Sequence, residues 1–195
     1  MIAAIRAGEP VILPTDTVYG LCADPFRPEP AQRVKRLKGR EQSQPLALLA
    51  ADVEALLECV PELRGRSGTI VGALLPGAYT LVLPNPAGRF PWLSGSRPET
   101  IGVRVPELAV EARSVVEAVG AVLATSANLH GGADPRRLDD VPAELRGAVA
   151  AEVDGGELPG TASTVLDLTA EEPRVLREGA VRAVEALARV RAAVG

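Results

Sequence analysis

Polar side chains in this sequence gather directly after short apolar runs. In the stretch PTDTVYGL, two threonines, an aspartate and a tyrosine follow the apolar residues Val11, Ile12 and Leu13. Similar hydroxyl, amide and guanidinium groups stand at or beside later apolar runs, at Thr100, Arg104, Thr125, Ser126, Asn128, Ser163, Thr164 and Arg177. Ligands of open α/β sheets bind in the crevice at the strand ends. We therefore expect these groups to converge on one site for a small polar ligand.

The residue types in this set indicate binding and charge neutralisation, because no enzyme nucleophile stands beside a general base. The sequence lacks both common phosphate-loop patterns, G-x-x-x-x-G-K-[ST] and G-x-G-x-x-G. His130 is the only histidine and Ser126 stands in no G-x-S-x-G elbow, so a Ser126–His130 hydrolase is disfavoured. We identify no direct protein ligands for a metal. The cations that could neutralise a triphosphate are Lys38, Arg40, Arg104 and Arg177.

Length and composition are those of an ordinary globular protein. The chain has 195 residues, a hydrophobic fraction of 47% and a formal net charge of −4. This acidic balance disfavours a protein that coats nucleic acid by charge alone. No signal peptide follows Met1, and no apolar run reaches the roughly 18 residues of a membrane helix. We expect a cytoplasmic protein, in which Cys22 and Cys59 are buried thiols.

Short apolar runs alternate with helical patterns, which predicts an α/β protein with a mixed sheet in one domain, residues 1–195. Strands are expected at residues 11–13, 46–50, 79–83, 101–105, 121–124, 164–168 and 174–176. Helices are expected at residues 31–38, 52–57, 70–75, 108–119, 143–150 and 182–194. The first of these helices carries a cluster of cations, a pattern that usually marks a solvated face. Residues 84–98, rich in Pro, Gly and Ser, form the longest expected loop.

Eight short motifs, in order along the chain, resemble those of the threonylcarbamoyl-AMP synthase family of the YrdC/TsaC type. They are PTDTVYGL from Pro14, Lys38-Gly39-Arg40, Pro45-Leu46, PGAYTL from Pro76, IGVRVP from Ile101, TSAN from Thr125, STV from Ser163 and LREG from Leu176. The family's K-x-R pair and later S-x-N correspond to Lys38, Arg40, Ser126 and Asn128. The similar YciO branch generally lacks this full set.

The resemblance implies a single twisted, mixed open sheet flanked by helices and hollowed into a positively lined cavity, the YrdC/RibB-like fold. It also implies a nucleotidyltransferase that forms threonylcarbamoyl-AMP and pyrophosphate from L-threonine, bicarbonate or CO₂, and ATP with Mg²⁺. No tightly bound organic cofactor is implied. Transfer proteins would then carry the threonylcarbamoyl group to adenosine 37 of tRNA, and whether tRNA binds directly is left open.

The resemblance also implies a role for each matching residue. Lys38 and Arg40 would be catalytic and hold the phosphates. The other nucleotide contacts would be Thr100, Ser126, Asn128 and Arg177. The threonine contacts would be Thr15, Arg104, Thr125 and Ser163. The chain departs from the family at Leu49, where some members have a histidine, and at Tyr79, as in the YciO branch. Its end at Gly195 predicts the short form, without a C-terminal domain.

Two alternatives remain open at this stage. One is an enzyme that forms carbamoyl-adenylate for another acceptor, as in related domains of larger carbamoyltransferases. The other is a binding protein for double-stranded RNA, tRNA or ribosome assembly on the same concave basic surface. The net negative charge and an aromatic fraction of 3% weaken the second alternative.

Overall fold

A nine-stranded mixed sheet organises the protein. The structure, a computed structural model, describes residues 1–39, 41 and 43–195, so Arg40 lies outside the described residues. The strand order is β7-β1-β2-β6-β3-β5-β4-β8-β9, with β7 and β9 at the edges. The strands are β1 (Val11–Pro14), β2 (Tyr19–Ala23), β3 (Ala47–Ala50), β4 (Tyr79–Pro84), β5 (Thr100–Arg104), β6 (Ala121–Ser126), β7 (Ala151–Glu152), β8 (Thr164–Asp167) and β9 (Arg174–Arg177). The pairs β1–β7, β3–β5 and β4–β8 are parallel, whereas the other neighbouring pairs are antiparallel.

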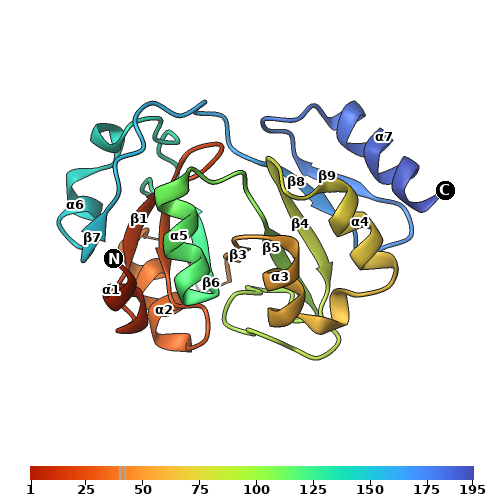
Figure 1. Ribbon diagram of the computed structural model, residues 1–195, viewed down its shortest axis with the longest axis horizontal. Coiled ribbons are helices and arrows are strands. Elements are labelled where there is room, and N and C mark those ends of the chain that lie inside the picture. The colour runs from red at the N-terminus through yellow and green to blue at the C-terminus, as the bar shows by residue number, and fades with distance from the viewer. Residues whose placement is uncertain (40, 42) are drawn as a thin grey trace.

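Helices flank this sheet, and Figure 1 shows them in two groups around its two halves. They are α1 (Ile2–Arg6), α2 (Pro28–Leu37), α3 (Val53–Cys59), α4 (Arg66–Leu74), α5 (Val110–Val119), α6 (Ala143–Arg146) and α7 (Ala183–Val194). Two short 3₁₀ turns, residues Pro61–Leu63 and Leu138–Asp140, complete the regular structure of the described residues. The predicted mixed α/β architecture with an open sheet flanked by helices is confirmed.

Local sequence signals explain where several helices begin and end. Pro28 occupies the first turn of α2, where a proline costs no hydrogen bond, and Gly39 with φ of +66° follows its C-terminus. Asp52 caps α3, because its Oδ1 accepts from the backbone N–H of Ala55 at 2.8 Å. Residues 143–150 were expected to be one helix. That expectation is wrong, since α6 ends at Arg146 and Gly147 follows it.

The two faces of the sheet are covered differently in its two halves. In the half formed by β1, β2, β6 and β3, helices α1 and α5 cover one face. Helix α2 packs on the other. In the half formed by β5, β4 and β8, α4 and α7 lie side by side on one face (Figure 1). Strand β4 shows the pattern, because Tyr79, Leu81 and Leu83 are buried while Thr80 and Val82 are only half-buried. The face that carries Thr80 and Val82 is left for the site.

Three other expectations concern the solvent exposure of helix α2, the burial of the two cysteines and the presence of a membrane-spanning helix. Helix α2 does not present a uniformly solvated cationic face, because Lys35 and Lys38 are buried although Arg36 is exposed. Cys22 is buried and Cys59 half-buried, and both are free thiols. Within the described ranges, no helix has the length and apolar character needed to cross a membrane.

Candidate active site

A cavity of about 540 Å³ opens on the face of β4 and β5 that carries Thr80 and Val82. This volume is within the usual range for small-molecule sites. Its floor contains Ala47, Gly102 and Ala124, three small residues that the strand registers place side by side. None of the described residues that line it belongs to a helix. The cavity therefore exists because small floor residues and loops replace a covering helix here.

Most residues predicted for the site line this cavity. They are Thr100, Arg104, Thr125, Ser126, Ser163 and Arg177. Thr15, Lys38 and Asn128 do not line it, although each belongs to a network that ends at a lining residue. Leu49, at the place of the family histidine, is buried against the cluster that includes α5.

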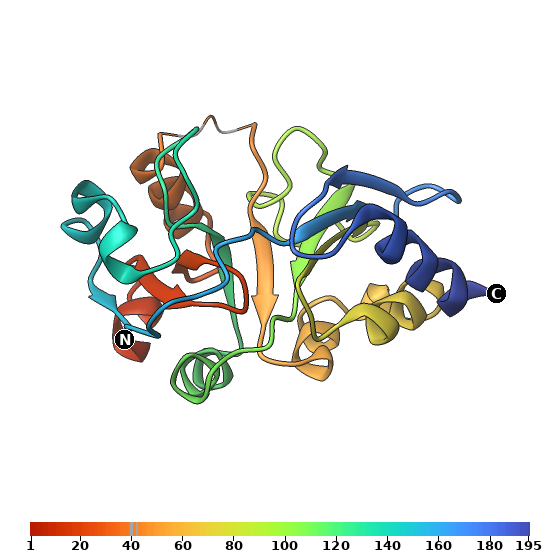
Figure 2. The ribbon, with the colours of Figure 1, turned by 90° about the horizontal axis from the view of Figure 1, so that it is seen from above.

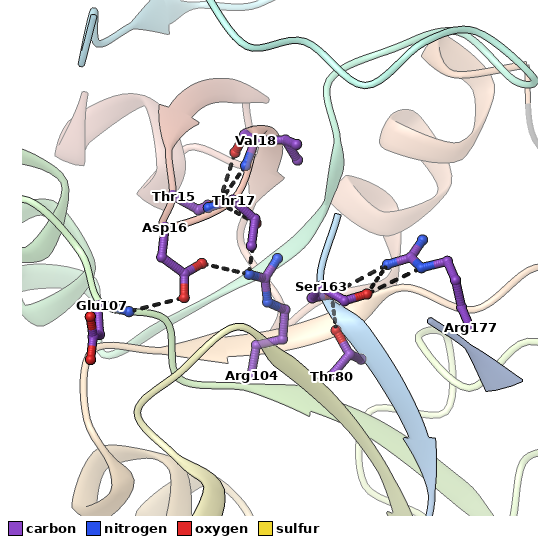
Figure 3. A network of polar contacts seen from close by, with 9 residues as sticks. All are labelled: Thr15, Asp16, Thr17, Val18, Thr80, Arg104, Glu107, Ser163 and Arg177. Atoms are coloured by element: carbon purple, nitrogen blue, oxygen red, sulfur yellow. Dashed lines mark hydrogen bonds and ion pairs between the residues drawn. The ribbon is translucent and has the colours of Figure 1, made fainter. Parts of the chain in front are cut away.

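Arg104 is the buried cation of the cavity. Its Nη2 donates to Asp16 Oδ1 at 2.9 Å and to Thr17 Oγ1 at 3.1 Å, as Figure 3 shows. Its Nε has no hydrogen-bond partner within the part of the chain that the structure describes. Burial lowers the pKa of Arg104, and burial raises the pKa of Asp16 despite the attraction of the guanidinium. The arrangement fixes one edge of the guanidinium and leaves donor capacity for an anion.

Thr15 acts on this cation through the turn that carries Asp16 and Thr17. Its hydroxyl donates to Val18 O at 2.7 Å and lies 3.0 Å from Thr17 Oγ1. It also accepts from the backbone N–H groups of Thr17 and Val18, each at 3.3 Å. Because the Thr15 proton goes to Val18 O, the Thr17 hydroxyl donates to Thr15 and accepts from Arg104. The PTDTVYGL motif thus holds Arg104 in place, and Val18 is its residue on the cavity wall.

Ser163 and Arg177 form the opposite wall (Figure 3). Arg177 donates to Ser163 O from Nε at 3.2 Å and from Nη2 at 2.9 Å. The Ser163 hydroxyl lies 2.8 Å from Thr80 Oγ1 and 3.3 Å from Arg177 Nη2. Of these two lining residues, Arg177 is exposed, whereas Ser163 is buried. A ligand can therefore contact the Arg177 guanidinium without breaking a buried ion pair.

The segment between β7 and β8 brings Ser163 to the cavity, and Figure 2 shows it crossing from one half of the molecule to the other. Tyr19 anchors this segment, since its hydroxyl donates to Gly156 O at 2.8 Å and accepts from the N–H of Gly155 at 2.9 Å. A backbone bond from Gly160 N to Thr17 O at 2.9 Å adds a second anchor. Tyr19 is thus a packing and anchoring residue of the wall.

Lys38 lies behind the wall, with its ammonium at the end of β6. Four oxygens lie within hydrogen-bond distance of its Nζ, namely Ser126 O at 2.5 Å, Asn128 Oδ1 at 2.5 Å, Asn128 O at 3.0 Å and Ser126 Oγ at 3.2 Å. Because the ammonium has three N–H groups, at least one of them is shared between two acceptors. The Ser126 hydroxyl in turn donates to Asn128 Oδ1 at 2.7 Å. The side chain is 1% exposed. Lys38 of the K-x-R motif therefore contacts both Ser126 and Asn128 of the S-x-N motif.

Several lining residues were not predicted from the sequence. They are Val18, Gln44, Thr80, Ser94, Ser96, Arg97 and His130, among others. Ser94 to Arg97 belong to the long loop at residues 84–98, whose composition could have drawn attention to it. The Thr100 hydroxyl donates to Arg97 O at 2.9 Å, which ties this loop to β5. No group of three or more His, Cys, Asp or Glu residues among the described positions could hold a metal ion.

Comparison with known proteins relates this site to one family. The model of the Sua5/YciO/YrdC family, described as "Telomere recombination", matches residues 3–179. A Bacillus subtilis protein named threonylcarbamoyl-AMP synthase is 33% identical over 181 residues, which are 92% of this chain and 52% of that protein. The chain thus spans about half the length of this relative.

Two solved structures have the same fold over nearly the whole chain. The structure of Pyrococcus abyssi Sua5 complexed with L-threonine has a TM-score of 0.87 and 31% identity. It covers 100% of this chain, which corresponds to 56% of that one. Escherichia coli YciO has a TM-score of 0.82 and 26% identity, covering 95% of this chain and 90% of that one.

Proposed function

The chain belongs to the Sua5/YciO/YrdC family, and on that premise we propose that it is an L-threonylcarbamoyladenylate synthase. It would form threonylcarbamoyl-AMP and pyrophosphate from L-threonine, bicarbonate or CO₂, and ATP. Other proteins would transfer the threonylcarbamoyl group to adenosine 37 of tRNA. The observation that carries the proposal is the cavity on which Thr100, Arg104, Ser126, Ser163 and Arg177 converge from four segments of the chain.

Arg104 is the group that we assign to the carboxylate of threonine. Asp16 and Thr17 hold its Nη2, so the guanidinium is oriented before the ligand arrives. A buried guanidinium binds a carboxylate with charge-assisted and geometrically specific hydrogen bonds. Thr125 and Ser163 complete the proposed threonine contacts, while Thr15 supports them through its turn.

The reaction needs no enzyme nucleophile. The threonine amine forms a bond to the carbon of CO₂ and releases a proton, which yields a carbamate. One carbamate oxygen then forms a bond to the α-phosphorus of ATP while the bond to the pyrophosphate oxygen breaks. The protein contributes by placing both reactants in one cavity and by neutralising phosphate charge. The proposed nucleotide contacts are three residues that line the cavity, Thr100, Ser126 and the exposed Arg177.

Lys38 supports the nucleotide side in this proposal by fixing the Ser126–Asn128 turn and by adding a positive charge behind it. Arg40, the second residue of the motif, stays a proposed phosphate contact and lies outside the described residues. Mg²⁺ is commonly held by substrate phosphates with few protein ligands. Mg²⁺ coordination mainly by the phosphates of ATP is compatible with a cavity whose described lining offers hydroxyls, amides and guanidiniums.

The test is pyrophosphate release by the purified protein with ATP and Mg²⁺. We expect release to require both L-threonine and bicarbonate. Arg104→Lys keeps a positive charge but loses the planar guanidinium and its paired N–H donors. It should raise the KM for threonine by about 10- to 100-fold with little change in the KM for ATP. Arg113→Ala on the exposed face of α5 is the control. Release that ignores threonine would favour an acceptor other than threonine, and no release with salt-dependent RNA binding would favour the binding protein.

A further inference from the structure

Four neighbouring strands place Arg104, Thr80, Val165 and Arg177 in one row across the sheet. Thr80 of β4 pairs with Val165 of β8, and Val165 pairs with Arg177 of β9. On the other side of β4, the antiparallel register with β5 puts Arg104 level with Thr80. Residues opposite each other in neighbouring strands have their side chains on the same face. All four line the cavity, so Thr80 and Val165 lie between two arginines of one site.

A pair of hydroxyl groups lies in the middle of this row. Thr80 Oγ1 is 2.8 Å from Ser163 Oγ, which is 3.3 Å from Arg177 Nη2. A Cβ on Gly102 would be 3.9 Å from Thr80 Cγ2, so the methyl group of Thr80 lies toward the cavity floor. Its hydroxyl lies toward Ser163, and Figure 3 shows the pair between Arg104 and Arg177.

One proton of this hydroxyl pair is left for a ligand. The two oxygens share one hydrogen bond, of which either can be the donor, and Ser163 Oγ also accepts from Arg177. Each hydroxyl has a single proton, so one proton joins the pair and the other has no acceptor in the described part of the chain. The contact between the hydroxyls is only partly buried, and Thr80 and Ser163 both line the cavity. The pair therefore offers a donor to an acceptor in the cavity.

The charges on either side of the pair favour an anion there. Burial is the main cause that lowers the pKa of Arg104; Asp16 opposes this shift, and the positive charge of Arg177 adds to it. The two guanidiniums thus repel each other across the cavity. A negative group placed between them is attracted by both cations and can accept the hydroxyl proton.

The proposed reaction has one anionic group that must lie between its two larger substrates. Arg104 is assigned to the carboxylate of threonine, and Arg177 is assigned to the nucleotide. The carbon that comes from bicarbonate becomes bonded to the threonine amine, and one of its oxygens becomes bonded to the α-phosphorus of ATP. This one-carbon group therefore lies between the threonine and nucleotide ends, which is the place of the hydroxyl pair.

We propose that Thr80 and Ser163 bind the one-carbon group, first as bicarbonate and then as the carbamate. This inference rests on the proposed function, because it locates the third substrate of that same site. Bicarbonate and the threonine amine give the carbamate and one water molecule. The hydroxyl pair holds one carbamate oxygen, and the other oxygen forms the bond to the α-phosphorus as the bond to the pyrophosphate oxygen breaks.

The KM for bicarbonate tests the proposal. Pyrophosphate release is measured at saturating ATP and threonine, with carbonic anhydrase present so that CO₂ and bicarbonate stay in equilibrium. Thr80→Val keeps the shape of the side chain without its hydroxyl, and should raise the KM for bicarbonate about 10-fold or more. The KM values for threonine and ATP should change by less than about threefold, because their charged contacts remain.

Three further variants complete the experiment. Thr80→Ser keeps the hydroxyl and should have a KM for bicarbonate within about threefold of the native value. Ser163→Ala removes the other hydroxyl and should raise the KM for bicarbonate in the same direction as Thr80→Val. Thr69→Val, at an exposed position of α4, is the matched control and should leave all three KM values unchanged.

Two outcomes overturn the assignment of the hydroxyl pair. One is a native KM for bicarbonate in both Thr80→Val and Ser163→Ala, and the other is a rise confined to the KM for ATP, which would assign the pair to a phosphate group. In either case, native pyrophosphate release that requires threonine and bicarbonate leaves the proposed function standing. Absence of release by the native protein would instead remove the proposed function and this inference together. Should Thr80→Val melt far below the native protein, Ser163→Ala decides between these outcomes.

Discussion

Replacing Lys38 with methionine separates two roles that the same residue could have. If Lys38 only contacts a phosphate, Lys38→Met removes a buried charge and puts an apolar chain of similar length in its place, which is often neutral or stabilising. If Lys38 fixes the turn after β6, the substitution removes the ammonium whose three N–H groups are shared among four oxygens of Ser126 and Asn128. The two roles therefore predict opposite effects on the ligand-free protein.

The geometry favours a loss of stability. Four oxygens lie 2.5–3.2 Å from Nζ, so they offset much of the cost of burying the ammonium. Removing the donor leaves buried acceptors unpaired at about 1–3 kcal/mol each. Asn128 Oδ1 keeps the bond from the Ser126 hydroxyl, which limits the loss. We expect a net destabilisation of about 3 kcal/mol, or roughly 6–12 °C in melting temperature for a chain of this size.

Thermal and urea unfolding of the ligand-free protein measure this effect, and ATP binding is measured on the same samples. Arg36→Met, an exposed position of the same helix, should change the stability by less than about 0.5 kcal/mol. A Lys38→Met protein that melts like the native one but no longer binds ATP would refute the positioning role. Lys38 would then act as a direct phosphate contact, as the family resemblance implies.

Three further predictions concern the cavity floor at Gly102, the carboxyl of Asp16, and the two cysteine thiols. A Cβ on Gly102 would meet nothing closer than 3.9 Å, so Gly102→Ala should fold normally, whereas Gly102→Leu should fill the cavity and reduce pyrophosphate release at least tenfold with little change in melting temperature. A large fall in melting temperature for Gly102→Leu would mean that no hollow lies above it. Burial raises the pKa of Asp16 above 3.8, so ionising this carboxyl costs more in the folded than in the unfolded chain. The free energy of unfolding of the native protein, relative to that of Asp16→Asn, should therefore fall as pH rises above 3.8. Urea unfolding of both proteins between pH 3 and 7 measures this difference, and a difference that increased with pH would contradict the prediction. Burial raises the pKa of Cys22 to about 12, so at pH 8 the folded protein should react with iodoacetamide more slowly at Cys22 than at Cys59. Mass spectrometry of both thiols tests this, and equal labelling before unfolding would argue against the burial of Cys22.

Elements with a strong local pattern were predictable from the sequence. The alternation in IGVRV predicts β5, because one face meets the core and the other meets the cavity. Asp52 predicts the start of α3, because a carboxylate satisfies free N–H groups of the first turn. Strand β2 was missed, since Tyr19–Ala23 is buried at every position and shows no alternation. Helix α1 was missed because five residues carry almost no periodic signal.

The identities of the predicted site residues came from motif spacing, but their contacts depend on long-range pairing. Lys38 and Ser126 are 88 residues apart, and nothing local to either residue predicts that one holds the other. Gln44 and Ser94 become neighbours only through the backbone bonds that link residues 43–46 to residues 93–96. Burial of Lys38 likewise depends on this tertiary partner, which is why the charge pattern of the helix alone misjudged it.

The uneven covering of the sheet explains why these distant groups share one hollow. In a mixed sheet, connecting loops lie at both ends of the strands. One face is therefore bordered by the turn that carries Asp16, the end of β6 and the segment 153–163. Helix α5 covers the neighbouring half of that face and leaves the half over Gly102 to polar loops. A helix there would have to bury Arg104 against apolar side chains, at a cost that its pairing with Asp16 would not offset. The buried arginine and the open half-face therefore require each other, and both are consistent with the anionic ligand that we propose for this site.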